Sequence, residues 1–261
     1  MLGNTGNVGV NLKKGLMGLG HNVVLCFNPH VVYDNEWVDY PLSYRNFWFH
    51  NGLDLNSFDI IHINAPDMMK FLFCWLQILK RHSSPKIVMH WHGSNLRYPF
   101  NFIFQPFFTN VCKHLGDFHL YSSIDLCFYL RNISDDCKML FLCPVDTDVF
   151  KPMIPLKCRP FDKLVWGKGR VGKDSWIPHG DVPVLLNQYR TVETYPDLGV
   201  SPFMMSVSAL EAGSCGCRVV HHPYLTRRWV LGNASVESQS RLLEGIYKHL
   251  LEDATRVGGV F

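Results

Sequence analysis

A carboxylate near the start of a short predicted helix is the residue of this sequence best placed to do chemistry. The stretch 206–220 reads SVSALEAGSCGCRVV, which is typical of a helix capped by Ser206 or Ser208 and followed by a strand. Free N–H groups at a helix N-terminus attract phosphate. Glu211, about one turn further along, can accept hydrogen bonds from sugar hydroxyls. The stretch therefore predicts a nucleotide site, and the alternative is a surface glutamate on an amphipathic helix.

Glycines near the N-terminus form a second candidate site. Gly3, Gly6 and Gly9 lie in a turn that precedes a predicted helix over 10–19 and a predicted strand over 23–27. Glycine permits tight turning and the close approach of a ligand to the backbone. The spacing differs from the dinucleotide motif GxGxxG, so a dehydrogenase is a weak interpretation, and a turn with no ligand remains the alternative.

The first sheet is expected to lack its opening strand. A βαβ unit needs a strand before the glycine turn, and only Met1 and Leu2 precede that turn here. We therefore expect a stub at most, either because the true start lies upstream or because this is a shortened form.

Composition and charge restrict the class of protein. The chain has 261 residues, 47% of them hydrophobic, which is enough for one large or two modest domains. A net charge of +3 with interspersed signs predicts no nucleic-acid partner. Nine cysteines without a CxxC motif indicate reduced thiols rather than a metal centre. With no signal peptide and no run of about 18 apolar residues, we expect a cytoplasmic protein without a transmembrane segment.

Short apolar runs that alternate with helical segments predict an α/β protein with parallel sheets. The proline-bounded stretch CPVDTDVFKP at 143–152 divides the chain into predicted domains 1–145 and 146–261. The apolar segment 68–79, closed by Lys80 and Arg81, predicts a core helix, with peripheral contact at the inner membrane face as the alternative. The other expected elements are strands at 58–63, 85–90, 117–121, 139–142, 164–166 and 191–194, and helices at 182–187 and 240–254.

The order of these pieces resembles the GT-B glycosyltransferases that use nucleotide-activated sugars, in particular their large retaining group. The segments that carry the resemblance are FDIIHIN, PKIVMHWHGSNLR, CPVDTDVFKP and SALEAGSCGCRVV. The linker and the last segment are the most specific of these. The resemblance implies two Rossmann-like domains that face each other across a cleft. It assigns the acceptor to the N-terminal domain and the nucleotide-sugar donor to the C-terminal domain.

The resemblance also implies roles for individual residues. Glu211 matches the family's second glutamate, which binds the ribose, whereas the position of the first glutamate holds Phe203. Arg170 and Lys173 match the basic pair that neutralises the diphosphate. His92, in the HGS loop, is expected to hydrogen-bond a sugar hydroxyl as the catalytic-site histidine. The implied reaction is transfer of a sugar from its nucleotide to a glycan, lipid or other hydroxyl, with retention and with no metal or cofactor.

Two other classes of function stay open. Phe203 and the missing first strand favour a partner subunit that binds nucleotide sugars without catalysis. Alternate residues on a strand share one face, so His90 and His92 could hold a metal in a hydrolase. Their further ligands would come from His62, His221 or His222.

Overall fold

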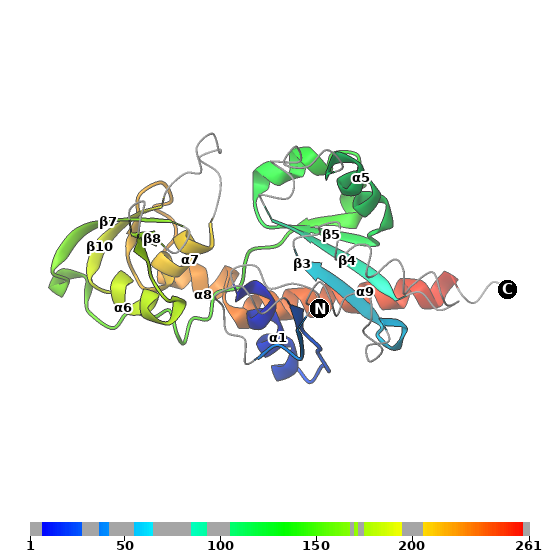
Figure 1. Cartoon of the computed structure of the whole chain (residues 1–261), viewed down its shortest axis with the longest axis horizontal. Coiled ribbons are helices and arrows are strands. Elements are labelled where there is room, and N and C mark those ends of the chain that lie inside the picture. Colours follow the sequence, from blue (N-terminus) through cyan, green and yellow to red (C-terminus); the bar gives the residue numbers. More distant parts are fainter. Residues whose placement is uncertain are drawn as a thin grey trace. The chain divides into compact units, whose positions relative to one another are not determined.

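The chain folds as two compact units (Figure 1). The computed structural model describes residues 7–27, 37–41, 55–64, 85–92, 105–167, 170–171, 175–194 and 206–257. Unit 1 comprises Met1–Phe141 and Ser240–Phe261, and unit 2 comprises Leu142–Gln239. The boundary adjoins the predicted linker 143–152. Residues 240–261, which the sequence analysis places in the second domain, group with unit 1.

Unit 1 is built on a parallel sheet with the strand order β3-β4-β5-β6. Its strands carry near-continuous apolar runs, as expected when both faces of a parallel sheet are covered. The core contains Ile61, Ile63, Met89, Trp91 and Leu130, all at most 2% exposed. The elements are α1 Val8–Gly18, β1 Cys26–Phe27, β2 Tyr40–Pro41, η3 Leu55–Ser57, β3 Ile60–Asn64, β4 Lys86–Trp91, α5 Gln105–Leu115, β5 Phe118–Tyr121, η4 Ile124–Leu130, η5 Asp135–Cys137 and β6 Lys138–Leu140.

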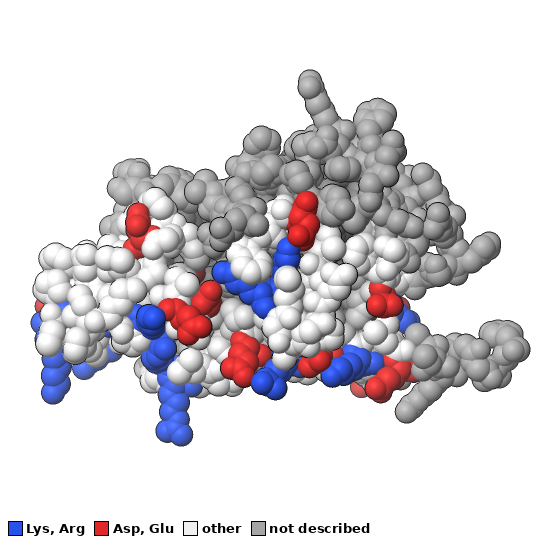
Figure 2. Space-filling model, turned by 90° about the horizontal axis from the view of Figure 1, so that it is seen from below, with Lys and Arg blue, Asp and Glu red and all other residues white. Residues whose placement is uncertain are grey.

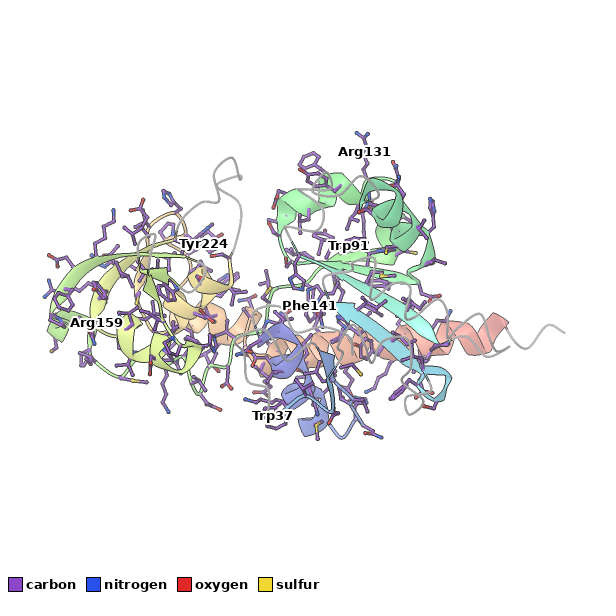
Figure 3. The ribbon with its side chains drawn as sticks, in the orientation of Figure 1. Trp37, Trp91, Arg131, Phe141, Arg159 and Tyr224 are labelled. Carbon is purple, nitrogen blue, oxygen red and sulfur yellow. The ribbon has the colours of Figure 1, made fainter. Side chains whose placement is uncertain are left out.

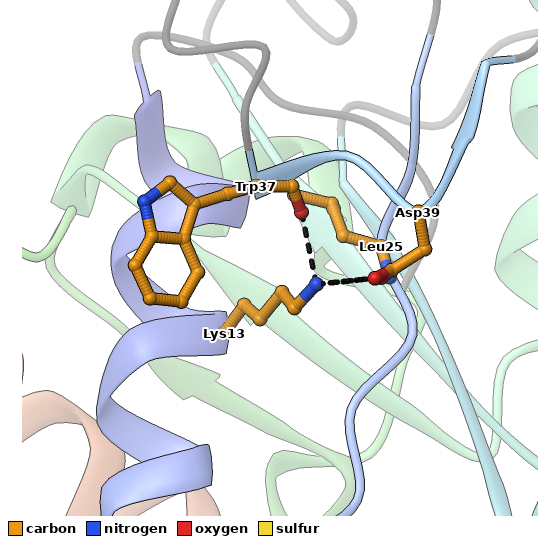
Figure 4. Close-up of polar contacts among 4 residues, drawn as sticks. All are labelled: Lys13, Leu25, Trp37 and Asp39. Carbon is orange, nitrogen blue, oxygen red and sulfur yellow. Dashed lines mark hydrogen bonds and ion pairs between the residues drawn. The ribbon is translucent and has the colours of Figure 1, made fainter.

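A buried lysine ties α1 to the segment that carries β2 (Figure 4). Lys13 Nζ lies 2.6 and 2.7 Å from the two carboxylate oxygens of Asp39 and 2.9 Å from the carbonyl oxygen of Trp37. Asp39 also accepts a hydrogen bond from the backbone N–H of Leu25 at 2.7 Å. The charge of Lys13 is therefore compensated where the helix buries it, as a buried charge requires.

Unit 2 contains a five-stranded sheet with the order β11-β10-β7-β8-β9. Strands β11, β10 and β7 are parallel, and β8 and β9 extend them as antiparallel strands. The final helix, α9, begins in unit 2 and continues into unit 1. The elements are η6 Leu156–Cys158, β7 Phe161–Gly167, β8 Arg170–Val171, β9 Ser175–Trp176, η7 His179–Asp181, α6 Val182–Leu186, β10 Tyr189–Thr194, α7 Val207–Ser214, β11 Arg218–Val219, α8 Arg227–Asn233 and α9 Val236–Val257.

Arg159 is a buried hub of unit 2, and Figure 3 labels it. The side chain is 1% exposed. Its Nε donates to the Ile154 carbonyl at 3.1 Å, and its two terminal nitrogens donate to the carbonyls of Tyr189 at 2.8 Å and Cys215 at 2.6 Å. These carbonyls come from a loop, the start of β10 and the C-terminal end of α7. One guanidinium thus joins three segments that are distant in sequence.

Most predicted elements are confirmed, with differences at their ends. The predicted strand 23–27 shortens to Cys26–Phe27, whose partner Tyr40–Pro41 ends at a proline that has no N–H to donate. Arg170, expected at the diphosphate, lies in strand β8, which forms a hairpin with β7 and was not predicted. Helices α5 and α8 were not predicted. The expected stub at Met1 and the helix 68–79 lie outside the described residues.

Charged residues of both signs are interspersed on the face that Figure 2 shows. Charged side chains of unit 2 form ion pairs, including Lys163 with Glu193 and Arg190 with Asp162. Within the described parts of the chain, no helix has both the length and the apolar character needed to cross a membrane.

Candidate functional site

Helix α7 presents its N-terminus at the edge of the sheet where ligands bind in folds of this type. Ser206 is the N-cap, because its Oγ accepts a hydrogen bond from the N–H of Ala209 at 3.1 Å. Backbone N–H groups in the first turn of a helix have no acceptor within the helix, and those of Val207 and Ser208 belong to this turn. Because α7 connects β10 to the parallel strand β11, its N-terminus lies at the carboxyl end of these strands. Open parallel sheets bind ligands at that edge.

Glu211 lies one turn into α7 and is buried, with 6% of its surface exposed. Its Oε1 lies 3.0 Å from Nε2 of His179, in the short helix before α6. The His179 ring packs against Phe150, with centroids 5.3 Å apart. The alternative interpretation of Glu211 as a surface glutamate is therefore wrong. Helix α7 packs against β10, β11 and α8, so the face that carries Glu211 is covered.

The two basic residues expected at the diphosphate are only partly described. Arg170 lies in β8, where its backbone pairs with Gly167 in the hairpin with β7. The side chain of Arg170 and the whole of Lys173 lie outside the described residues. Ser208 lies in the first turn of α7 and is half-buried. The diphosphate contacts remain a prediction.

Three histidines gather at the carboxyl end of the unit 1 sheet. His92, 7% exposed, directly follows β4, and its ring lies 4.3 Å from the ring of His90. Nδ1 of His90 lies 3.3 Å from Nε2 of His62. Nδ1 of His62 lies 2.6 Å from the hydroxyl of Tyr247 on α9. The three histidines thus form a packed polar cluster between β3, β4 and α9.

Burial keeps His62, His90 and Tyr247 uncharged. It lowers the pKa of His62 to about 3 and lowers the pKa of His90 well below its ordinary value. It also raises the pKa of the Tyr247 phenol. His62, His90 and Tyr247 are therefore neutral at physiological pH, and each imidazole carries a single ring proton.

The described residues offer no set of metal ligands that would support the metal-hydrolase interpretation. Among them, no group of three or more His, Cys, Asp or Glu side chains is arranged to hold a metal ion. The rings of His90 and His92 pack against each other at a tilt of 35°. In unit 2, His221 lies beside Glu193 and His222 beside Tyr224.

The glycine turn is described only from its end. Gly3 and Gly6 lie outside the described residues, as does Phe203. Gly9 belongs to the first turn of α1, because the helix begins at Val8 rather than at the predicted residue 10. Asn7, with a φ of 58°, takes the left-handed conformation that ends the turn. The prediction that the turn extends to Gly9 is therefore wrong.

Two residues of the described sites were missed by the sequence analysis. His179 contacts Glu211 across 32 residues, and Tyr247 contacts His62 across 185 residues. No local pattern links either pair. Only the tertiary structure brings them together.

Comparison with known proteins gives a match in fold alone. No protein-family model and no curated protein matches the sequence. An alpha-glucosyltransferase in complex with UDP and a 13-mer DNA containing a central A:G mismatch matches with a TM-score of 0.55 at 10% identity, over 84% of this chain and 77% of that chain. Anabaena Alr3699/HepE in complex with UDP matches with a TM-score of 0.54 at 9% identity, over 98% of both chains. The same protein in complex with UDP and glucose matches with a TM-score of 0.53 at 9% identity, over 100% and 99%.

These likenesses define the class of fold. The chain is an α/β protein whose sheets are built on parallel strands, and its fold matches that of Alr3699/HepE over nearly the full length of both chains. The predicted fold class is confirmed to that extent.

Proposed function

We propose that this chain is a glycosyltransferase that uses a UDP-sugar as donor. In this proposal unit 2 binds the donor and unit 1 binds the acceptor, a glycan, lipid or other hydroxyl compound. The observation that carries the proposal is the combination of the α7 N-terminus at the carboxyl end of parallel strands with Glu211 one turn further along. The match to solved glycosyltransferases crystallised with UDP supports the choice of uridine nucleotide.

The geometry of unit 2 suits the two ends of a nucleoside diphosphate. N–H groups of Val207 and Ser208 at the positive end of the helix dipole would face the phosphates. Glu211 would accept hydrogen bonds from the ribose hydroxyls. The contact with His179 uses one of its oxygens, and a carboxylate has about four lone-pair sites, so capacity for the ribose remains.

The proposed reaction breaks the bond between the anomeric carbon and a phosphate oxygen, whose electron pair stays on the departing UDP. The acceptor hydroxyl forms the new glycosidic bond, with retention at the anomeric carbon, and its proton passes to the departing diphosphate. Charge that develops on the diphosphate is stabilised by the α7 N-terminus together with Arg170 and Lys173. His92 of unit 1 hydrogen-bonds a sugar hydroxyl. In this proposal the α7 N-terminus and the two basic residues supply the positive charge for the step.

A second candidate is a subunit that binds nucleotide sugars without transferring them. It is favoured by Phe203, which stands eight residues before Glu211 where the resembled family has a glutamate for the transferred sugar. The two candidates share the donor site, and turnover separates them. Release of UDP from UDP-glucose in the presence of hydroxyl acceptors supports the enzyme. UDP-glucose binding without release supports the subunit.

The first prediction tests the donor site through Glu211→Gln. The substitution keeps size and removes charge-assisted hydrogen bonds, which contribute about 1.5–3 kcal/mol. We expect the affinity for UDP, measured by isothermal titration calorimetry, to fall roughly 10- to 150-fold. Glu237→Gln is the matched control, because Glu237 lies exposed in the first turn of α9, and there the affinity should stay as in the parent.

Glu211 is buried, so the folded state of each variant must be measured beside its affinity. Circular dichroism and the thermal midpoint identify variants that have lost structure. A folded Glu211→Gln protein that binds UDP as the parent does would remove the donor-site assignment. A parent that binds no uridine nucleotide would remove the proposed function itself.

A further inference from the structure

Three neutral side chains of unit 1 form a directional chain of hydrogen bonds. Its three members are Tyr247, His62 and His90, joined at 2.6 Å and 3.3 Å. His62 and His90 are 2% and 0% exposed, and Tyr247 is half-buried. The ring of Phe141, labelled in Figure 3, meets the ring of His90 edge-on with centroids 5.2 Å apart.

The position of the proton on each imidazole ring gives this chain of hydrogen bonds its direction. Each neutral imidazole has one N–H and one acceptor nitrogen. A phenol O–H is a stronger hydrogen-bond donor than the N–H of a neutral imidazole, so in this 2.6 Å contact we take the Tyr247 hydroxyl as the donor and His62 Nδ1 as the acceptor. The proton of His62 then sits on Nε2 and is donated to Nδ1 of His90. The proton of His90 is therefore on its Nε2.

This last N–H is the unusual feature of the cluster. Within the described structure, Nε2 of His90 is buried and has no hydrogen-bond partner. A buried donor without an acceptor costs about 1–3 kcal/mol, so its presence calls for an explanation such as a ligand or an ordered water. His90 lies near the end of β4, at the carboxyl edge of a parallel sheet, where ligands bind in open α/β folds.

We propose that His90 is a binding residue of unit 1 whose Nε2–H donates a hydrogen bond to a hydroxyl oxygen of a neutral carbohydrate. His62 and Tyr247 are positioning residues that hold the proton on Nε2. The carbohydrate is neutral because the cluster offers a donor without positive charge. The group that reaches the N–H is small, because His92 and Phe141 pack against the His90 ring. This inference rests on the proposed function in taking unit 1 as the acceptor side.

Tyr247→Phe tests the chain without touching His90. The substitution removes one oxygen, so His62 Nδ1 loses its donor and the two imidazoles can reverse their tautomers. His90 would then present a lone pair on Nε2 instead of an N–H. Tyr129→Phe is the matched control, because Tyr129 lies in η4 of the same unit and is 42% exposed.

The first measurement needs no ligand. In the full chain labelled with 15N-histidine, we expect the parent and Tyr129→Phe to show His62 and His90 protonated on Nε2. Tyr247→Phe should move the His90 signals toward the Nδ1-protonated form. Signals are assigned from His62→Gln and His90→Gln variants. A parent in which His90 Nε2 carries no proton overturns the inference, whatever the fate of the proposed function.

The second measurement adds a panel of neutral monosaccharides that includes D-glucose, D-galactose and D-mannose. At least one sugar should shift the Nε2 signal of His90 in the parent and in Tyr129→Phe. In Tyr247→Phe the apparent affinity for that sugar should fall about tenfold, which corresponds to one hydrogen bond. The affinity for UDP should be unchanged. If no sugar moves the signal, or if Tyr247→Phe binds the sugar as tightly as the parent, the N–H serves an ordered water only and the inference is wrong. UDP binding separately decides the proposed function.

Discussion

At the scale of single residues, unit 2 depends on a charge that has no carboxylate among its hydrogen-bond partners in the described part of the chain. Arg159 is buried, and neutral carbonyls, one amide oxygen and one thiol take its N–H groups. Two of the carbonyls lie where a helix ends: Leu186 is the last residue of α6 and Cys215 is the C-cap of α7. The negative ends of two helix dipoles therefore face the guanidinium and stabilise it.

The second prediction follows from that geometry. Arg159→Lys keeps the charge but offers three donors from one point, so it cannot reach carbonyls on three segments. We expect the free energy of unfolding, measured with urea, to fall by about 2–4 kcal/mol, because at least one buried carbonyl loses its donor.

Arg190→Lys is the control for Arg159→Lys. Arg190 pairs with Asp162 at the surface, with side chains 43% and 85% exposed. Exposed pairs contribute about 0–1 kcal/mol, so this variant should unfold close to the parent. Equal effects of the two substitutions would contradict the role given to Arg159.

At the scale of elements, the packing of α7 against the segment before α8 requires a glycine. A Cβ placed on Gly213 would lie 2.9 Å from the carbonyl oxygen of Leu225 and 3.3 Å from Val230. The close contact is with backbone, which cannot rotate away as a flexible side chain can. The contact at Gly213 therefore fixes the distance between α7, which carries Glu211, and the Leu225 segment.

The third prediction compares two glycine-to-alanine substitutions in helices. Gly213→Ala should lower the free energy of unfolding by about 1–3 kcal/mol, the usual range for overpacking. Gly245→Ala in α9 meets no atom within 4 Å, so it should raise stability by about 0.5–1 kcal/mol through helix propensity. Urea unfolding of both variants measures the contrast. A stabilising Gly213→Ala would show that α7 and the Leu225 segment can separate without loss.

Local sequence patterns predicted the helices and strands well. They did not predict burial or side-chain partners, because these depend on tertiary contacts. Helix α7 lies within the predicted stretch 206–220 because a cap at Ser206 and the glycine at 216 lie at its two ends, where such residues commonly begin and stop helices. The burial of Glu211 was not predicted, because its sequence neighbours do not reveal how many layers cover a helix. The partners His179 and Tyr247 were not predicted either, because each comes from a distant part of the chain.

At the scale of the whole molecule, buried histidines make stability depend on pH. Burial lowers the pKa of His62 to about 3, the pKa of His119 to about 4 and the pKa of His90 well below its ordinary value. All three titrate near 6.5 in the unfolded chain. Below pH 6.5 the unfolded state therefore binds more protons than the folded state, and stability falls as the pH falls.

The fourth prediction gives this dependence a size. Stability from these histidines is fully present above pH 6.5 and is lost progressively toward pH 4 for His119 and pH 3 for His62. Each group contributes a slope of up to about 1.4 kcal/mol per pH unit. Urea unfolding between pH 7.5 and pH 5 should show the midpoint falling steadily below pH 6.5. A midpoint independent of pH over that range would mean that the histidines titrate in the folded state as they do in the unfolded chain.

The path of α9 has a consequence for how the chain folds during synthesis. Residues 240–257 pack in unit 1, where Leu243 is fully buried and Tyr247 reaches His62 across 185 residues of sequence. Unit 2 uses one continuous stretch, Leu142–Gln239. A ribosome therefore delivers every residue of unit 2 before it delivers the helix that completes unit 1. The segment made first finishes folding last, and until then its open core is a surface for chaperones to bind.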